Sequence, residues 1–382
     1  MNNYQVRNTN KKRIINYLYK NDGASKQDVM TALGLSAPTV TLIMKELAER
    51  GLVKKAGTLE SSGGRKPAAN SLVYDAKLSI GVAVTGNHLR LAAIDLSGSV
   101  IGRRRLREPF RSEAGYYKAL AGHIEAFIAE VGLERDKLLG IGLAVPGIVN
   151  AKKNLLEYSP TLGVKYLPLN VVTGYIPYPV MVDNEANLAD MTEIWRLDDM
   201  EDAVYLSVNK GVGGAVIVGN KLFYGLDGRS GEFGHMTIVE GGDTCSCGKK
   251  GCLEAYCSTR VLTEPDFDDI DDFFAAVKAG NRACIVKWRR YLDHLATGIN
   301  NIYTIFNSNV IVGGEISGYL EQSADLLRQM LTTLCTFETR ADYLHFSQYG
   351  DYASAIGAAL LLVDNFLNAP AANITRGSIQ SY

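Results

Sequence analysis

GEFGHMTIVEGGDTCSCGKKGCLE, residues 231–254, is the stretch of this sequence that most narrows its fold and its chemistry. It places His235, Cys245, Cys247 and Cys252 within 18 positions. Three thiolates and one imidazole are a complete ligand set for a tetrahedral zinc ion. The Cys-x-Cys spacing is tighter than that of common zinc fingers, but the glycines and lysines between the cysteines argue against simple core packing. The segment therefore predicts a structural zinc site.

The alternative for these cysteines is a loop that carries reduced thiols. A chain of 382 residues with six cysteines has too few of them for a disulfide scaffold. With four ligands in place Cys257 is redundant, and Cys284 and Cys335 are expected to be small buried side chains.

Carboxylate and amide side chains accompany the cysteine segment. Glu232 and Glu254 lie within it, and Asn184-Glu185 lies upstream. Such groups, together with an imidazole, hold the hydroxyls of a sugar by donating and accepting in fixed directions. His235 can serve twice, since one ring nitrogen ligates the metal and the other donates to a hydroxyl. Each carboxylate alone could be an ordinary surface charge or a helix cap. The sugar site is therefore predicted from all of these residues together.

The charge along the chain is uneven. Residues 1–67 hold 12 basic and 5 acidic residues, whereas the remainder holds 28 basic and 36 acidic residues. A basic head on an acidic body favours contact with a polyanion, although basic patches are often only solvated surface.

Three short helices are predicted in the head. Apolar residues at helical spacing indicate a first helix over residues 10–20, and Ser25 with Asp28 forms a weak capping box for the second. Ser36 can cap the third helix, whose residues Val40, Ile43, Met44 and Leu47 form one buried stripe. The pattern is typical of a helix-turn-helix whose last helix enters the major groove. The expected DNA contacts are Ser36, Pro38, Thr39, Thr41 and Lys45.

A basic wing is predicted after these helices. Leu52-Val53 and Ser71–Tyr74 indicate the two strands of a hairpin, with SSGGRKP at 61–67 between them. Arg65 and Lys66 put two cations at a flexible tip that can reach phosphates or a narrow minor groove. An ordinary basic linker is the alternative, and the preceding helices favour the wing.

From Leu78 onward, strands, helices and glycine-rich turns alternate, which indicates an α/β architecture. Two β-hairpins, around Gly86-Asn87 and around 211–214, suggest a duplicated lobe. By themselves these turns are weak evidence for nucleotide binding. Strands are also expected at 139–145, 179–182 and 309–312, and helices at 116–131, 184–197, 266–279, 281–300 and 353–366, the last of them buried.

Residues 231–236, 245–248 and 251–254 resemble the signature of the ROK family (repressors, open reading frames, kinases). The head, with its SSGGRKP segment, resembles the operator-binding domain of the repressor branch. The resemblance covers roughly residues 10–368 and implies an actin-like, sugar-kinase-type (ribonuclease H-like) pair of α/β lobes around a cleft. It implies a winged helix-turn-helix domain over 1–73, a first lobe over 74–198 with the helix 353–368 packed against it, a second lobe with the zinc loop over 199–352, and a tail over 369–382.

The same resemblance places Asn184, Glu232, His235 and Glu254 where the family contacts a monosaccharide. Glu185 stands at the position of the kinases' catalytic aspartate, which takes a proton from the sugar hydroxyl that attacks the γ-phosphate. We therefore count Glu185 among the expected sugar-binding residues.

The departures from the kinase pattern concern the phosphate side of the cleft. The kinases carry Asp-x-Gly-Gly-Thr where this sequence has 83–87, so Ala83 replaces a magnesium-associated carboxylate and Thr85 adds a side chain. Lys210 stands where the second phosphate loop carries threonine. Glu185 moves its carboxylate by about one methylene, and a misplacement of about 1 Å can cost roughly 100-fold in rate. These changes predict that phosphoryl transfer has been lost and that the protein is not an enzyme.

The favoured function is a sugar-responsive transcriptional regulator, a repressor, that binds operator DNA and a monosaccharide effector. One head buries too little DNA for tight selective binding, so a homodimer or homotetramer is expected. One alternative is a sugar kinase that phosphorylates a hexose and also binds DNA. Another is a DNA-binding protein whose body only oligomerises or docks a second protein.

The sequence also predicts a cytoplasmic protein without a membrane partner. Its longest apolar run, residues 353–363, has 11 residues, which is too short to span a bilayer. No apolar segment follows the charged start MNNYQVRNTNKKR, so no signal peptide is expected.

Overall fold

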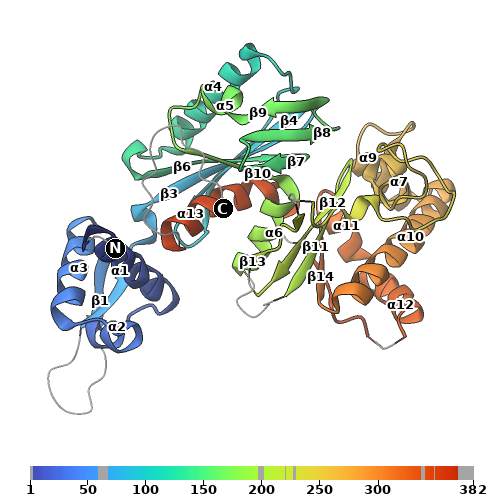
Figure 1. The fold of residues 1–382 in the computed structure, drawn as a ribbon. Coiled ribbons are helices and arrows are strands. Elements are labelled where there is room, and N and C mark those ends of the chain that lie inside the picture. The colour runs from blue at the N-terminus through green and yellow to red at the C-terminus, as the bar shows by residue number, and fades with distance from the viewer. Residues whose placement is uncertain are drawn as a thin grey trace.

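The computed structural model describes residues 3–58, 68–196, 202–219, 221–226, 229–336, 340–347 and 349–368. A small head of helices and a hairpin, at the lower left in Figure 1, adjoins a body of two lobes. The expected wing tip with Arg65 and Lys66, and the tail from residue 369, lie outside the described residues. Within the described part of the chain, no helix combines the length and the apolar character that a membrane crossing requires.

The head is a three-helix unit closed by a two-stranded hairpin. Helix α2 begins with the expected capping box, in which the Ser25 hydroxyl accepts from the Asp28 backbone N–H and Asp28 accepts from the Ser25 backbone N–H. The stripe of helix α3 is buried as predicted, in one apolar cluster with residues of α1 and α2. The head elements are α1 (Asn3–Lys20), α2 (Lys26–Leu33), α3 (Ala37–Glu49), β1 (Val53–Thr58) and β2 (Ala68–Leu72).

Two local expectations for the head are wrong. The strands were expected at 52–53 and 71–74, but they pair from Val53↔Leu72 to Thr58↔Ala68, because the ladder continues through polar residues that give no apolar pattern in the sequence. Tyr74 lies in a short 3-10 turn and not in the strand. Ser36 does occupy the N-cap of α3, but its hydroxyl makes no capping bond and lies 2.9 Å from the Thr39 hydroxyl.

The first lobe is built on a five-stranded sheet with strand order β10-β6-β3-β4-β5. Helix α4 (Ala114–Val131) covers one face, and α13 (Ala353–Asn368) covers the other. Two strand glycines make room for α13, because a Cβ on Gly81 or Gly142 would lie within 2.0 Å of its backbone. The strands are β3 (Leu78–Val84), β4 (His88–Asp95), β5 (Val100–Arg107), β6 (Leu138–Val145) and β10 (Val180–Asn184).

The second lobe repeats this plan. Its sheet has the order β15-β14-β11-β12-β13, with parallel and antiparallel neighbours in the same sequence as in the first sheet. The expectation of a duplicated lobe is confirmed, and the two glycine turns are the corresponding β3–β4 and β11–β12 connections. The strands are β11 (Ala203–Val208), β12 (Val212–Val218), β13 (Lys221–Leu222), β14 (Asn309–Gly313) and β15 (Leu344–Phe346).

Two helices lie between the sheets. Helix α6 (Glu185–Arg196) packs on β11 and β12 of the second lobe and on α13, which packs on the first sheet (Figure 1). The two helices approach closely because Gly357 has no side chain, and a Cβ there would lie 1.5 Å from the Leu188 carbonyl oxygen. Thr192 Oγ1 also donates to the Ala353 carbonyl oxygen at 2.7 Å. The layers are therefore sheet, α13, α6 and sheet.

Helices cover the outer face of the second lobe, and a small sheet extends the first. Helix α9 begins four residues later than expected because Asp269 caps it, its side chain accepting from the Asp272 N–H. Strand β5 and the small sheet were not predicted individually. The elements are α7 (Glu254–Cys257), α8 (Thr259–Thr263), α9 (Ile270–Lys278), α10 (Arg282–Phe306), α11 (Ser317–Gln322) and α12 (Ala324–Leu334) outside, and β7 (Ile148–Asn150), β8 (Leu155–Ser159), β9 (Val164–Pro168) and α5 (Leu169–Thr173) on the first lobe.

Candidate functional site

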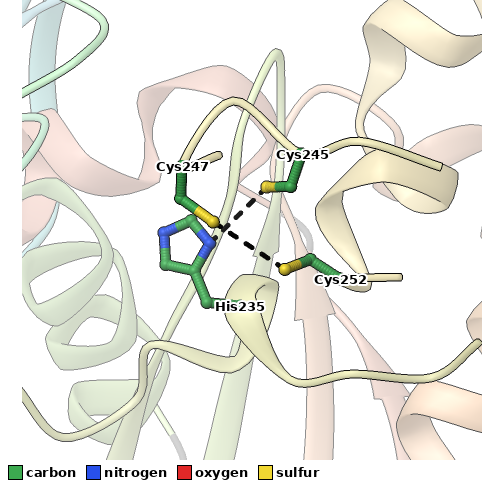
Figure 2. A group of neighbouring side chains, drawn as sticks. All are labelled: His235, Cys245, Cys247 and Cys252. Carbon is green, nitrogen blue, oxygen red and sulfur yellow. Dashed lines mark hydrogen bonds between the residues drawn. The ribbon is translucent and has the colours of Figure 1, made fainter. Parts of the chain in front are cut away.

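Four side chains of the quoted segment converge on one point (Figure 2). The ligand atoms of His235, Cys245, Cys247 and Cys252 all lie within 4.8 Å of one another. Cys247 Sγ is 3.8 Å from Cys252 Sγ, and Cys245 Sγ is 3.7 Å from His235 Nδ1. A tetrahedral ion with metal–sulfur distances of about 2.3 Å separates its sulfurs by about 3.8 Å. The donor set therefore fits a metal ion that all four residues ligate.

Glycines let the histidine reach this point. The turn that carries His235 (Phe233–His235) lies directly on β12, where a Cβ on Gly231 would lie 2.2 Å from the Gly214 carbonyl oxygen. A Cβ on Gly234 would lie 2.0 Å from the Val212 carbonyl oxygen. The two glycines therefore fix the turn against the strand.

The thiols differ in acidity because their surroundings differ. A hydrogen bond from the Lys249 backbone lowers the pKa of Cys247, whereas burial raises the pKa of Cys252 to about 12. A divalent cation stabilises both thiolates, so metal binding is expected to release protons and to weaken as the pH falls. Outside the cluster, Cys257 and Cys284 are buried, but Cys335 is only half-buried, which corrects the expectation for that residue.

The two ring nitrogens of His235 face different groups. Nδ1 points toward the thiols, while Nε2 lies 3.9 Å from Oε2 of Glu232. Loss of hydration raises the pKa of Glu232, and His235 opposes this shift. The structure thus places the second nitrogen of His235 and a carboxylate side by side, as a sugar hydroxyl would require.

Glu254 is tied into the protein on both carboxylate oxygens. Oε2 accepts from the Val212 backbone N–H at 3.1 Å, and Oε1 accepts from the Ser246 hydroxyl. The side chain is 10% exposed. In this arrangement Glu254 connects the loop that carries Cys245 and Cys247 to the β11–β12 hairpin, so it positions that hairpin.

Asn184 and Glu185 lie at the start of α6, the helix that packs on β11 and β12. Asn184 caps the helix, since its Oδ1 accepts from Ala186 N at 2.7 Å and its Nδ2 donates to the Gly147 carbonyl oxygen at 2.7 Å. The pKa of Glu185 is raised to about 7, chiefly by burial. The positive charge of Arg90 opposes this shift, and the negative charge of Glu315 adds to it. A carboxyl group that titrates near neutrality is suited to accept a proton or a hydroxyl hydrogen bond.

One contact between the lobes was not anticipated. Tyr224 follows β13, and its hydroxyl donates to Oδ2 of Asp183 at 2.9 Å. Asp183 also accepts from the Asn187 side chain at 3.2 Å. In the sequence, the only indication of this contact is an acidic residue beside Asn184-Glu185. Tyr224 is 41 positions away along the chain, and no local pattern links it to Asp183.

Three of the expected DNA contacts recur at helical spacing on one side of α3, and a fourth, Ser36, is exposed at its N-cap. Pro38, Thr41 and Lys45 are exposed, and Thr39 is half-buried. The side chain of Lys45 is 72% exposed and lies 3.8 Å from Glu49. The expected list omitted Leu42, which is 53% exposed on the same side and is available to the methyl group of a thymine.

Two family models match the chain. One, described as ROK family, matches residues 79–365, and the other, described as winged helix-turn-helix DNA-binding, matches residues 7–54. Together they cover the two-lobed body and the three helices of the head.

The chain is similar over nearly its whole length to a regulator. It is 27% identical to a protein of Caldicellulosiruptor bescii named xylose repressor, covering 97% of this chain and 99% of the relative. Among solved structures, a ROK family transcriptional regulator described as a homolog of the Escherichia coli MLC protein covers 95% of this chain and 98% of its own, with a TM-score of 0.76 and 21% identity.

The body alone is similar to a kinase. The structure of a ROK family glucokinase from Streptomyces griseus in complex with glucose and AMPPNP covers 74% of this chain and 98% of its own. Its TM-score is 0.62 and its sequence identity is 25%. The regulator therefore matches head and body, and the kinase matches only part of the chain.

Proposed function

Since this chain belongs to the ROK family, we propose that it is a sugar-responsive transcriptional repressor that has lost kinase activity. One observation carries the proposal: a helix-turn-helix head with an exposed recognition surface is packed onto a two-lobed sugar-kinase-type body. A relative that matches the chain from end to end is named xylose repressor, which supports the same function.

The head would bind operator DNA through α3. We assign Ser36, Pro38, Thr39, Thr41 and Lys45 to this contact, and Arg65 and Lys66 to a wing contact that lies outside the described residues. A two-fold operator would engage two heads, so we propose a homodimer or homotetramer in the cytoplasm.

Lys45→Ala is expected to weaken operator binding about 5- to 150-fold, the range of a contact worth 1–3 kcal/mol. Its exposed pair with Glu49 contributes little to stability, so the thermal midpoint should not change. Fluorescence anisotropy with a labelled operator at two salt concentrations measures the effect. Lys278→Ala, on a surface helix of the body, is the matched control. Equal affinities for the two variants would remove Lys45 from the interface.

The effector would be a monosaccharide held by Asn184, Glu185, Glu232, His235 and Glu254. Glu232 and His235 offer a carboxylate and a ring N–H side by side, while Glu254 and Asn184 hold the hairpin and the helix start that border them. We propose that His235 and the three cysteines clustered with it hold a structural Zn²⁺ ion, which keeps the Glu232–His235 turn in place.

A sugar kinase remains the second candidate because Glu185 titrates near neutrality, as a general base requires. The opposing feature is Ala83 in β3, which lies where the kinases carry a carboxylate for magnesium. A coupled ATP-consumption assay across monosaccharides decides between them. Sustained turnover would contradict the loss of kinase activity.

Glu185→Gln is expected to stabilise the protein above pH 7. Because burial raises the pKa of the folded state to about 7, ionising Glu185 costs folding free energy as the pH rises through that value. The gain should reach up to about 3 kcal/mol at pH 8 and fall to a few tenths of a kcal/mol near pH 4, where the carboxyl is mostly protonated in both states. Thermal denaturation from pH 4 to pH 8 measures it. Glu185→Asp, which still titrates, is the control, and an equal gain at every pH would contradict the assignment.

A continuous path joins the sugar site to the head. Helix α6 starts at Glu185 and ends near Trp195, whose ring centroid is 5.6 Å from that of Tyr19 on α1. Trp195 Nε1 also donates to the Ser97 carbonyl oxygen at 3.3 Å. Lys12 of α1 donates to the Asn365 carbonyl oxygen of α13 at 3.3 Å. We propose that a sugar which favours one lobe arrangement moves α6 and thereby the head.

A thermal-shift screen of sugars, followed by operator binding with each hit, tests the whole proposal. The expected result is a sugar that raises the thermal midpoint and changes operator affinity. A protein that binds no duplex DNA at any salt concentration would overturn it.

A further inference from the structure

The proposed sugar site takes its residues from both lobes. Asn184 and Glu185 lie where β10 of the first sheet ends, whereas Glu232 and His235 belong to a turn that follows β13 of the second sheet. A sugar that contacts both halves requires a defined separation between them. A residue that links the two segments would therefore control sugar binding without touching the sugar.

Asp183 provides such a link on the side of the first lobe. Its Oδ1 accepts from the backbone N–H of Asn184 at 2.7 Å and from Nδ2 of Asn187 at 3.2 Å, so it holds the first turn of α6. Its Oδ2 accepts from the hydroxyl of Tyr224 at 2.9 Å. One carboxylate thus joins the start of α6, where Glu185 lies, to the second lobe.

Tyr224 provides the link on the side of the second lobe. The backbone N–H of Phe223 donates to the Val216 carbonyl oxygen of β12 at 2.8 Å, which attaches the segment to the second sheet. The carbonyl oxygen of Tyr224 accepts from the Ser230 backbone N–H at 3.3 Å. Ser230 lies two positions before Glu232, so the backbone of Tyr224 is bonded to the start of the turn that carries Glu232.

This turn is packed closely against the tyrosine segment and against β12. A Cβ on Gly225 would lie 3.2 Å from Cβ of Ser230. A Cβ on Gly231 would lie 2.2 Å from the Gly214 carbonyl oxygen. Because interiors packed this closely transmit displacements, Tyr224 and the Glu232 turn are expected to move together.

Core packing does not account for the tyrosine. Tyr224 is 40% exposed, and its neighbours Phe223 and Leu226 are 54% and 89% exposed. The lobes are joined in any case by α6 and α13, which approach closely at Gly357. One hydrogen bond from a half-exposed phenol adds little stability to that contact. It does act directly on the separation between the two halves of the proposed sugar site.

We propose that Tyr224 is a positioning residue of the sugar site, whose hydrogen bond to Asp183 holds the Glu232 turn and the start of α6 at the separation that the sugar requires. The inference rests on the proposed function, because it concerns the same monosaccharide site. A bond that forms in the sugar-binding arrangement of the lobes and a sugar that favours this arrangement stabilise each other. Tyr224 therefore increases sugar affinity through Asp183.

Tyr224→Phe removes the hydroxyl and keeps the ring. The test uses the full-length, zinc-loaded protein and whichever of xylose, glucose and N-acetylglucosamine raises the thermal midpoint of the wild-type protein most. Isothermal titration calorimetry is expected to show sugar affinity about 5-fold weaker in the variant, the ratio that about 1 kcal/mol produces. The thermal midpoint without sugar should not change. Tyr175→Phe, which removes the hydroxyl of a 43% exposed tyrosine of the first lobe, is the matched control and should bind sugar like the wild type.

Two further measurements distinguish positioning from a local structural role. In an Asp183→Ala background the tyrosine lacks its partner, so adding Tyr224→Phe should weaken sugar binding by less than about 2-fold. Hydrogen exchange of the sugar-bound protein should increase in Tyr224→Phe at residues 184–187 of the first lobe as well as around Ser230, because the bond joins both segments. If Asp183→Ala does not fold, the exchange pattern decides.

Four results would overturn the inference. They are sugar binding in Tyr224→Phe that equals or exceeds that of the wild type, an equal loss in Tyr175→Phe, an undiminished effect in the Asp183→Ala background, and exchange that changes only around Ser230. If the wild-type protein binds a sugar and changes its operator affinity while Tyr224→Phe behaves identically, only this inference fails. If the wild-type protein binds none of the three sugars, the proposed function fails with it.

Discussion

Trp195→Ala is expected to produce a protein that binds its operator and its sugar normally but no longer couples the two. Trp195 lies in the last turn of α6 and contacts Tyr19 of the head, whereas two of the proposed sugar residues, Asn184 and Glu185, lie at the start of the same helix. Removing the indole leaves both binding surfaces intact and removes the contact through which α6 reaches α1. A typical coupling of 1–3 kcal/mol, about 5- to 150-fold in operator affinity, should fall to less than about 2-fold.

The measurement is operator affinity with and without saturating sugar, together with the affinity for sugar alone. Tyr19→Ala should show the same loss of coupling from the head side, and Tyr19→Phe, which keeps the ring, should retain it. A uniform fall in stability would not change the ratio of the two operator affinities. A wild-type ratio in both alanine variants would show that the coupling does not pass through this aromatic contact.

Cys247→Ser is expected to remove the metal and, with it, most of the sugar response. The thiolate supplies one of four ligands. Losing it should cost more than the roughly 10- to 100-fold in metal affinity that is lost when a residue hydrogen-bonded to a ligand is changed. Cys247 is exposed, so the substitution itself creates no cavity in the core. Without the ion, the turn with Glu232 and His235 loses its attachment to the cysteine loop, and sugar affinity should fall.

Elemental analysis of the purified variant and calorimetry with the identified sugar are the measurements. Cys335→Ser, a cysteine outside the cluster, is the control and should retain stoichiometric metal and sugar binding. Operator affinity without sugar should be unchanged in both variants, because both cysteines lie in the second lobe, outside the apolar cluster that contains the head. Stoichiometric zinc in Cys247→Ser would contradict the ligand set.

The site was only partly visible in the sequence. The four candidate metal ligands lie within one short segment, so their spacing could be read directly, and the structure brings them together. Leu42 and Tyr224 were missed because neither has a local signal, an exposed leucine being no different in sequence from a buried one. Glu254, which we propose as a sugar residue, also accepts hydrogen bonds from Val212 and Ser246, and nothing in the sequence indicated these two contacts.

Local chemistry was sufficient wherever neighbours along the chain make the structure. The Ser25–Asp28 capping box, the apolar stripe of α3 and the hairpin turns of β3–β4 and β11–β12 each depend on residues a few positions apart. The family signature around the cysteines likewise needed no long-range information, and it led to the correct two-lobed fold with a winged head.

Long-range packing decided the rest. Arg105 of β5 shares a face with Arg90 only because β5 pairs with β4 in the register that sets the two residues opposite each other. The contact of Trp195 with Tyr19 joins residues 176 positions apart, and the sandwich of α6 and α13 depends on the missing side chain of Gly357. Spacing along the chain encodes which residues share a helix or strand face. Which faces then meet is set by the free energy of burying them together, and that depends on the whole chain at once.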